Sequence, residues 1–391
     1  MAAAVALSWR GRGVSVPNPN VGCLIVKDGI VVGRGWTQAG GRPHAEAMAL
    51  AQAGMATRAA TAYVTLEPCA HESERGPSCA DSLIEAGIGH VVVALVDPDP
   101  RTAGQGIARL AAAGVAVTSG IGTKGARRAM AGSLSQMERG RPYVTLKLAT
   151  SLDGCIATAQ GESQWITGEA ARAHGHLERA LADAIVVGRG TYEADHPRLD
   201  VRLAGLEGRS PARLILSSSF SGSRGGAEAR RELGSTDSPL RTLRPLREKD
   251  LVHAEFAESA ELKISMPNSL RALAKGQVHP ERLQGSRRAP PRERKEDWII
   301  INHPEDVSEL SNIQTVLVEG GALTAASFLR TGLVDRLLLY RAPILIGGGK
   351  ACLGDIGLTS LADAHDRWVL TDSRQLGKDR LDVYEAAQQA T

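Results

Sequence analysis

Four residues between positions 44 and 79 have the types and spacing of a hydrolytic zinc site. His44 and Glu46 stand two positions apart, and a Glu-Pro-Cys run ending at Cys69 is followed by Cys79. A catalytic zinc ion needs three protein ligands and an open position for water, and one imidazole with two thiolates supplies them. Zinc lowers the pKa of that water, and a nearby carboxylate can carry its proton to a leaving amine. We predict His44, Cys69 and Cys79 as ligands and Glu46 as the catalytic proton carrier.

The spacing of the two cysteines departs from the usual deaminase pattern. Zinc deaminases carry His-x-Glu followed by Pro-Cys-x-x-Cys, whereas nine residues separate Cys69 from Cys79 here. A structural zinc site prefers a fourth ligand, and His71 is the candidate within this loop. Such a site would not need Glu46. A structural zinc ion, or a non-catalytic binding module stabilised by zinc, therefore stays as an alternative to hydrolytic deamination.

Composition narrows the class of protein and of partner. The 391 residues are enough for two or three domains, and 43% of them are hydrophobic. A formal net charge of +3 and only 3% aromatic residues argue against nucleic acid as the main partner. No apolar run approaches the ~18 residues of a membrane span. Five cysteines, an odd number, argue for a reducing cytoplasm, with Cys23, Cys155 and Cys352 expected in the core.

Alternating strand and helix patterns predict two successive α/β units. In the first unit we expect a hairpin of strands at 21–26 and 30–32, and a short helical end at residues 1–7. The other elements expected there are helices at 44–53, 79–86 and 107–113, strands at 62–66, 91–96 and 115–117, and a connecting helix at 130–141. The second unit is expected to hold strands at 143–149, 184–187, 213–216, 315–318 and 336–339. The predicted domains are therefore 1–141 and 142–391.

One region does not fit this pattern. Residues 221–296 are rich in Gly, Ser, Pro and Arg, and we interpret them as a long, partly disordered insertion. A solvated surface loop is the simpler interpretation. A basic tail that binds nucleic acid is the other.

Residues 17 to 141 resemble the deaminase half of the bifunctional riboflavin-biosynthesis deaminase–reductase family. The likeness is carried by residues 17–22, 43–46, 65–71, 97–100 and 103–106. A widened loop between the cysteines is characteristic of this family, although the residues of the 71–79 loop differ from its usual sequence. The resemblance implies a cytidine-deaminase-like three-layer domain. It also implies that Asn18 hydrogen-bonds the pyrimidine ring and that His71 lies near the ribose phosphate. A turn residue before Pro19 is the alternative for Asn18.

A strand at 315–318 runs into Glu319-Gly320-Gly321 and then into a helix at about 324–329. Glycines at such a turn let a pyrophosphate approach the helix N-terminus, where free amides and the helix dipole favour anions. The same glycines also serve any tight turn between a strand and a helix. This motif alone is therefore weak evidence for a nucleotide site.

Residues 142–217 and 313–358 resemble the reductase half of the same family, which has a dihydrofolate-reductase-like α/β fold. The likeness is carried by residues 146–154, 161–167, 187–191, 195–199, 318–322 and 342–348. It implies that NADPH is bound by Thr150, Trp165, Thr191, Asp195, Ser218 and Gly321. It also implies that the substrate is contacted by Ser163, Arg179, Leu199, Arg202 and Glu319.

Simpler interpretations exist for several of these residues. Arg179 and Arg202 offer paired donors to a phosphate, but either can be surface charge. Trp165 can be a core residue, and Lys147 can serve solubility alone. Asp153 and the glycine after it can form no more than a turn.

We therefore predict zinc-dependent deamination of a phosphoribosylamino-pyrimidinone, followed by reduction of its sugar to a ribityl chain with NADPH. The partner is a phosphoribosylated pyrimidine, with no nucleic acid and no membrane, and family likeness implies a homo-oligomer. The family's usual strands and helices between Ser218 and Ile313 are hard to find in this sequence. A deaminase whose second half has lost reductase activity is therefore one alternative. A nucleic-acid base deaminase with a basic accessory domain is another.

Overall fold

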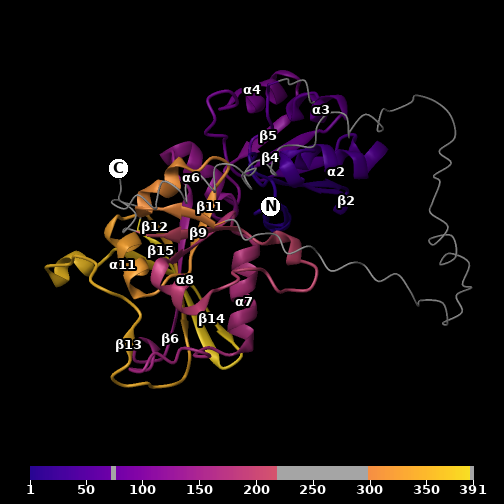
Figure 1. The fold of residues 1–391 in the computed structure, drawn as a ribbon. Coiled ribbons are helices and arrows are strands. Elements are labelled where there is room, and N and C mark those ends of the chain that lie inside the picture. The colour runs from indigo at the N-terminus through magenta and orange to yellow at the C-terminus, as the bar shows by residue number, and fades with distance from the viewer. Residues whose placement is uncertain (72–75, 218–297, 388–391) are drawn as a thin grey trace, which may run out of the picture.

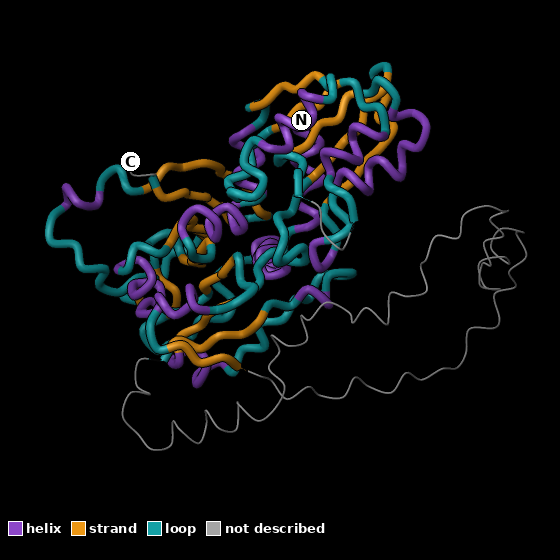
Figure 2. Tube along the Cα trace, turned by 90° about the horizontal axis from the view of Figure 1, so that it is seen from above, coloured by secondary structure: helices purple, strands orange, loops and turns teal. Residues whose placement is uncertain are grey.

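The computed structural model describes residues 1–71, 76–217 and 298–387. Figures 1 and 2 show two α/β units side by side, with the N-terminal unit at one side of the larger C-terminal unit. Among the described residues, no helix combines the length and the hydrophobicity needed to span a bilayer. The predicted insertion at 221–296 lies outside the described residues.

The first unit has a five-stranded sheet in the order β2-β1-β3-β4-β5. Its strands are β1 (Gly22–Lys27), β2 (Ile30–Trp36), β3 (Thr61–Val64), β4 (His90–Val93) and β5 (Ala116–Ser119). Strands β1 and β2 form the predicted antiparallel hairpin, and β3, β4 and β5 are parallel. One core cluster joins the sheet to α2 (Ala45–Ala53), α3 (Cys79–Glu85) and α4 (Gln105–Ala112). Helices α1 (Ala2–Ser8), α5 (Thr123–Ala129) and α6 (Ala131–Arg139) contribute to a second cluster, so the domain has three layers.

Two glycines of β2 let α2 approach the sheet closely. A Cβ added to Gly35 would lie 1.9 Å from the carbonyl oxygen of Ala45, and one added to Gly33 would lie 2.2 Å from that of Ala49. Only hydrogen fits in this space, so glycine is needed at both positions. The close packing fixes the beginning of α2, where His44 and Glu46 lie.

The second unit has an eight-stranded sheet in the order β10-β9-β8-β11-β6-β12-β15-β14. Its strands are β6 (Tyr143–Thr150), β8 (Ala184–Gly188), β9 (Ala212–Leu216), β10 (Trp298–Ile301), β11 (Thr315–Val318), β12 (Val334–Arg341), β14 (Trp368–Leu376) and β15 (Asp379–Ala386). The strands from β10 to β12 are parallel, whereas β15 and β14 are antiparallel. The helices described here are α7 (Glu169–Ala180), α8 (Arg189–Asp195) and α11 (Ala322–Arg330). A small second sheet pairs β7 (Cys155–Ala157) with β13 (Lys350–Ala351).

Most predicted elements exist, with ends shifted by a few residues, and the structure adds elements that were not predicted. The connecting helix expected at 130–141 is confirmed as α6, which is capped by Gly140 with a φ of 69°, whereas α5 before it was not predicted. The N-terminal segment is a complete helix, α1. Strand β10 and the 3-10 helix at Pro304–Glu309 lie in the stretch where family elements were hard to find. Cys352 is half-buried and packs against the core of the second unit, whereas Cys23 and Cys155 are buried as expected. Elements α7, α8, β14 and β15 were not predicted.

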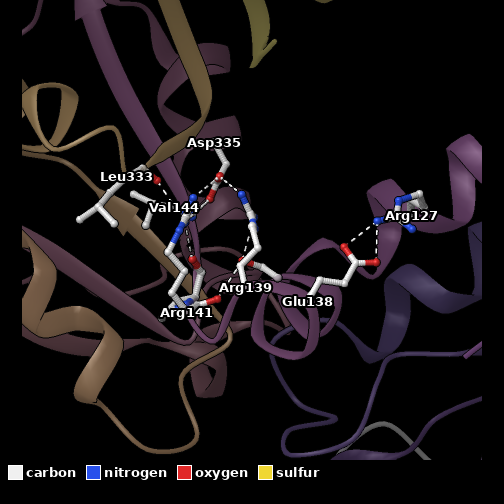
Figure 3. A network of polar contacts seen from close by, with 9 residues as sticks. Arg127, Glu138, Arg139, Arg141, Val144, Leu333 and Asp335 are labelled. Carbon is white, nitrogen blue, oxygen red and sulfur yellow. Dashed lines mark hydrogen bonds and ion pairs between the residues drawn. The ribbon is translucent and has the colours of Figure 1, made fainter. Parts of the chain in front are cut away.

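Asp335, at the beginning of β12, ties α6 to the second sheet (Figure 3). Its carboxylate accepts hydrogen bonds from Arg139 at 2.6 Å, from Arg141 at 2.8 Å and from the backbone N–H of Val144 at 2.8 Å. Only 7% of the Asp335 side chain is exposed. This network joins the end of the first unit to two neighbouring strands of the second.

We expect Asp335→Asn to lower the unfolding free energy by on the order of 3 kcal/mol, because two guanidinium groups lose their buried partner. Glu138→Gln is the matched control, since the Arg127–Glu138 pair in the same view is solvent-exposed and such a pair contributes about 0–1 kcal/mol. Urea unfolding of both variants measures the difference. Equal shifts in the two variants would contradict this account of Asp335.

Candidate functional site

The three predicted zinc ligands converge in the first unit, although they come from three separate segments. His44 is the residue before α2, Cys79 is the first residue of α3, and Cys69 lies in the loop after β3. Nδ1 of His44 is 3.2 Å from Sγ of Cys79 and 3.8 Å from Sγ of Cys69. All three ligand atoms lie within 4.8 Å of one another. One imidazole and two sulfur atoms at this spacing fit a zinc ion with one open coordination position.

The two thiols differ in their electrostatic environment. The Cys79 thiol donates a hydrogen bond to Cys69 and lowers the pKa of Cys69, against the effect of burial, with a further contribution from His44. The backbone N–H of Cys79 also points to Sγ of Cys69 at 3.3 Å. The site therefore already favours a thiolate, the form in which cysteine binds metal ions.

Glu46 lies in the first turn of α2 and is only 4% exposed. Its carboxyl interacts with the Cys79 thiol, so it faces the ligand cluster. Burial raises the pKa of Glu46 to about 7. A carboxyl group that gains and loses a proton near neutral pH, beside a metal site, suits a proton carrier.

Asn18 reaches the zinc ligands from a distant part of the chain. Its Nδ2 donates to the carbonyl oxygen of Gly41 at 2.9 Å and lies 3.3 Å from Nε2 of His44. Gly41 has a φ of +88°, and an added Cβ would lie 2.7 Å from the Asn18 side chain. These contacts lie outside any local turn, so the turn interpretation does not account for the Asn18 side chain.

His71 follows Cys69 by two residues and is half-buried. Its Nδ1 atom is buried and has no hydrogen-bond partner in the part of the chain that the structure describes. A buried polar atom without a partner is costly. Within the described residues, His71 therefore keeps an unpartnered ring nitrogen two residues along the chain from the ligand Cys69.

Glu67 fixes the loop that carries Cys69, a role the sequence did not reveal. Its buried carboxylate accepts backbone N–H groups from Asp97 at 3.2 Å, Gly104 at 2.9 Å and Ile107 at 3.0 Å. A Cβ added to Gly106 would lie 1.9 Å from the carbonyl oxygen of Pro68. The loop therefore rests directly on the beginning of α4.

The second candidate site lies at the carboxyl ends of the parallel strands in the second unit. Gly188 ends β8, and Gly320 and Gly321 follow β11. A Cβ added to Gly188 or Gly320 would lie 2.1 or 2.4 Å from the Thr324 side chain, so the two turns meet there. Gly321 is the residue before α11 and has no side-chain cap, which leaves backbone N–H groups free for an anion. Open α/β sheets bind nucleotides at this edge, so the site fits NADPH.

Glu319 and Arg179 form a buried ion pair at the same edge. Nε and Nη2 of Arg179 donate to the two carboxylate oxygens of Glu319 at 2.7 and 2.9 Å, and Lys147 is 3.7 Å away. The side chains of Glu319 and Arg179 are 9% and 15% exposed, so Arg179 is not surface charge. Burial raises the pKa of Glu319, but Lys147 and Arg179 outweigh it and lower the pKa to about 2.

The other predicted residues of this site differ in what they contact. Thr150 is buried at the end of β6, and Thr191 is 3.5 Å from the position of a Cβ added to Gly321. Arg202 is half-exposed and contacts His176. Leu199 is buried, whereas Ser163 and Asp195 are exposed, and Ser218 lies outside the described residues.

The core interpretation of Trp165 is wrong. Its side chain is 66% exposed, and the guanidinium of Arg172 lies 4.7 Å from its ring centroid.

Three further residues have roles that the sequence interpretation missed. Lys147 supports Glu319 and also lies 5.9 Å from the ring centroid of Tyr340, so it does more than confer solubility. His176 contacts Arg202 and the carbonyl oxygen of Asp200. Asp153 accepts backbone N–H groups from the glycine-rich segment at 346–347, so it is more than a turn residue. No sequence signal paired Lys147 with Glu319, which lies 172 positions further along the chain.

Two family models match the chain in order. Residues 1–95 match the cytidine and deoxycytidylate deaminase zinc-binding region, and residues 142–381 match the RibD C-terminal domain. The riboflavin biosynthesis protein RibD of Escherichia coli strain K12 is 37% identical over 391 residues, covering 97% of this chain and 96% of the relative. RibD of Mycobacterium tuberculosis strain H37Rv is 36% identical over 387 residues, covering 97% and 95%.

Two solved structures resemble this chain over nearly its whole length. Acinetobacter baumannii RibD has a TM-score of 0.71 at 34% identity, with 99% of this chain and 98% of that chain covered. A diaminohydroxyphosphoribosylaminopyrimidine deaminase/5-amino-6-(5-phosphoribosylamino)uracil reductase from Thermotoga maritima has a TM-score of 0.71 at 27% identity, with 99% and 97% covered.

We expect the stabilising effect of Glu319 to depend on pH. Its pKa of about 2 in the folded protein compares with about 4.3 in unfolded chains. The carboxylate's contribution is therefore fully present above about pH 4.3 and is lost as the pH falls through about 2. Urea unfolding should show Glu319→Gln less stable than wild type by on the order of 3 kcal/mol at pH 7. This difference should shrink between pH 4 and 2.5.

Glu193→Gln serves as the control, because the Arg189–Glu193 pair is half-exposed and is expected to contribute about 0.3–0.5 kcal/mol. A Glu319→Gln deficit that stays constant from pH 7 to 2.5 would contradict the ion-pair account.

Proposed function

The chain belongs to the RibD family of riboflavin biosynthesis enzymes, and we propose that its two halves divide the two reactions near residue 141. It is a bifunctional enzyme with a zinc-binding deaminase domain and an NADPH-dependent reductase domain. We assign residues 1–141 to deamination and residues 142–391 to reduction. The beginning of the RibD C-terminal match at residue 142 supports this division.

Deamination rests on one observation above all, the convergence of His44, Cys69 and Cys79 with the buried carboxyl of Glu46. When bound, zinc supplies a water of lowered pKa at its open coordination position. Glu46 takes a proton from this water as the water oxygen bonds to the ring carbon that carries the exocyclic amine. Glu46 then gives that proton to the amine as the carbon–nitrogen bond breaks. Ammonia leaves, the remaining hydroxyl proton passes to the adjacent ring nitrogen, and a ring carbonyl replaces the amine.

We assign two further residues to substrate binding in this half. Asn18, held by Gly41 beside His44, hydrogen-bonds the pyrimidine ring. His71, with its buried and unpartnered Nδ1 among the described residues, contacts the ribose phosphate. The substrate would be the diaminohydroxyphosphoribosylaminopyrimidine named for the Thermotoga maritima relative.

Reduction is assigned to the carboxyl edge of the larger sheet. When bound, NADPH would supply a hydride to C1′ of the opened sugar, which is linked to the pyrimidine amine as an imine, and the imine nitrogen would take up a proton, so that the ribityl chain stays attached. We propose that the residues lining the cofactor are Thr150, Trp165, Thr191, Asp195, Ser218 and Gly321. The residues proposed to contact the substrate are Ser163, Arg179, Leu199, Arg202 and Glu319. Because Arg179 is paired with Glu319, these two would act as one unit, whereas Arg202 is half-exposed, contacts His176 and Asp200 through Nε, and would present the rest of its guanidinium to a phosphate.

The remaining proposals concern the setting of the enzyme. We propose a small-molecule substrate without nucleic acid, a cytoplasmic location and a homo-oligomeric state. Val369 and Leu370, which are exposed side by side on the edge strand β14, support association of two copies. Strand β10 pairs with β9 and so extends the parallel sheet that carries this site. This argues against the alternative in which the second half has lost its reductase activity.

Ammonia release and NADPH oxidation, followed separately on zinc-loaded protein, test this proposal. We expect Glu46→Gln to slow ammonia release by roughly 10²–10⁴-fold, because the proton carrier is lost. The same variant should oxidise NADPH at the wild-type rate when the deaminated intermediate is supplied, and this second rate is the internal control for folding. Wild-type protein that releases ammonia but never consumes NADPH would refute the reductase assignment. Undiminished ammonia release by Glu46→Gln would refute the role of Glu46.

A further inference from the structure

Gln314 of the reductase half joins the two halves through both ends of its side-chain amide. Its Nε2 donates to the carbonyl oxygen of Pro17 at 2.8 Å, and its Oε1 accepts from the hydroxyl of Ser133 at 2.9 Å. Its backbone is fixed as well. The backbone N–H donates to Asp183 at 3.0 Å, and the carbonyl accepts from the N–H of Tyr143 at 2.8 Å.

The amide of Gln314 is therefore held in one place relative to the larger sheet. The buried carboxylate of Asp183 also accepts the N–H and the hydroxyl of Thr315, each at 2.8 Å, so the beginning of β11 is anchored at two successive residues. Because the Pro17 carbonyl can only accept, the NH2 end of the amide faces Pro17 and the oxygen end faces Ser133. The Nε2 donor of Gln314 therefore faces the Pro17 carbonyl from a residue whose backbone is hydrogen-bonded on both sides.

The segment that receives this hydrogen bond lies against the reductase half along its length. Arg12 is buried and interacts electrostatically with Glu178 and Arg336. A Cβ added to Gly13 would lie 2.9 Å from the carbonyl oxygen of Ala180, at the end of α7. Contacts with the reductase half therefore constrain the position of residues 12–17 of the deaminase half.

This segment leads directly into the deaminase site. Asn18 follows Pro17, and its side chain contacts Gly41 and His44. A change in the position of the Pro17 carbonyl passes to Asn18 through one peptide unit, which is planar and stiff. Within the first half, the backbone N–H of Ser15 donates to Gly11 and that of Gly40 donates to Val14, but among the described residues none of these bonds reaches the Pro17 carbonyl.

We propose that Gln314 is a positioning residue for deamination, which holds Pro17 so that Asn18 meets the pyrimidine ring beside His44. This inference rests on the proposed function of the first half. It makes the deaminase site depend on a side chain of the reductase half. Gln314 immediately precedes β11, and the other end of that strand leads to Glu319 and to the glycine turn before α11.

Gln314→Met in the full-length, zinc-loaded enzyme tests the proposal, because methionine keeps the length of the side chain and removes the amide. We expect the deaminase KM to rise roughly two- to tenfold, the effect of one lost hydrogen bond, with a smaller change in kcat. Zinc content should stay at the wild-type level. The reductase KM values for NADPH and for supplied deaminated intermediate should also stay unchanged. Ser133→Ala is the matched control, since it leaves the bond to Pro17 in place, and its deaminase KM should stay within about twofold of wild type.

Three outcomes would overturn the proposal. The first is an unchanged deaminase KM in Gln314→Met. The second is an equal fall in both activities or a loss of zinc, which indicates a general structural role. The third is an equal rise in KM for Ser133→Ala. Wild-type protein without ammonia release would instead refute the proposed function itself, and the inference with it.

Discussion

The meeting of one imidazole nitrogen and two sulfur atoms within 4.8 Å is the constraint on which the first half of the structure depends. Two of these ligands stand at the beginnings of helices, so α2 and α3 must both point their N-termini at one spot. Glycines in β2 allow α2 to pack closely enough, and Glu67 holds the loop of Cys69 by three backbone N–H groups. Glu46 comes with α2 and is buried beside the ligands, where its raised pKa suits proton transfer.

Strand β11 connects the chemistry of the two halves. Its beginning follows Gln314, which contacts the segment of Asn18, and its end leads to Glu319 and the glycines before α11. The strand is fully buried between β8 and β6, so its position is fixed by packing on both sides. Asp335 of β12 binds Arg139 at the end of the connecting helix α6 and also the backbone of Val144 in β6. The two halves are therefore joined by directed polar contacts as well as by the chain.

The sequence was most informative where chemistry restricts residue type. His44, Glu46, Cys69 and Cys79 could be predicted because few residue types bind zinc or carry protons, and their motif is local. The Arg179–Glu319 pair joins residues 140 positions apart, so both were named but not their contact. Glu67 and Gln314 escaped prediction because their partners are backbone groups and, for Gln314, also a distant serine hydroxyl, none of which leaves a pattern in the sequence. Helices α7 and α8 and strands β14 and β15 are positioned by tertiary packing, and their own patterns did not reveal them.

X-ray absorption at the zinc edge of the purified enzyme tests the central claim most directly. The account predicts two sulfur ligands at about 2.3 Å and one histidine nitrogen and one oxygen at about 2.0–2.1 Å, with the oxygen from exchangeable solvent. Such a site has the open position that hydrolysis requires. A shell of four protein ligands, with a second histidine in place of the solvent oxygen, would contradict the account and identify the zinc as structural.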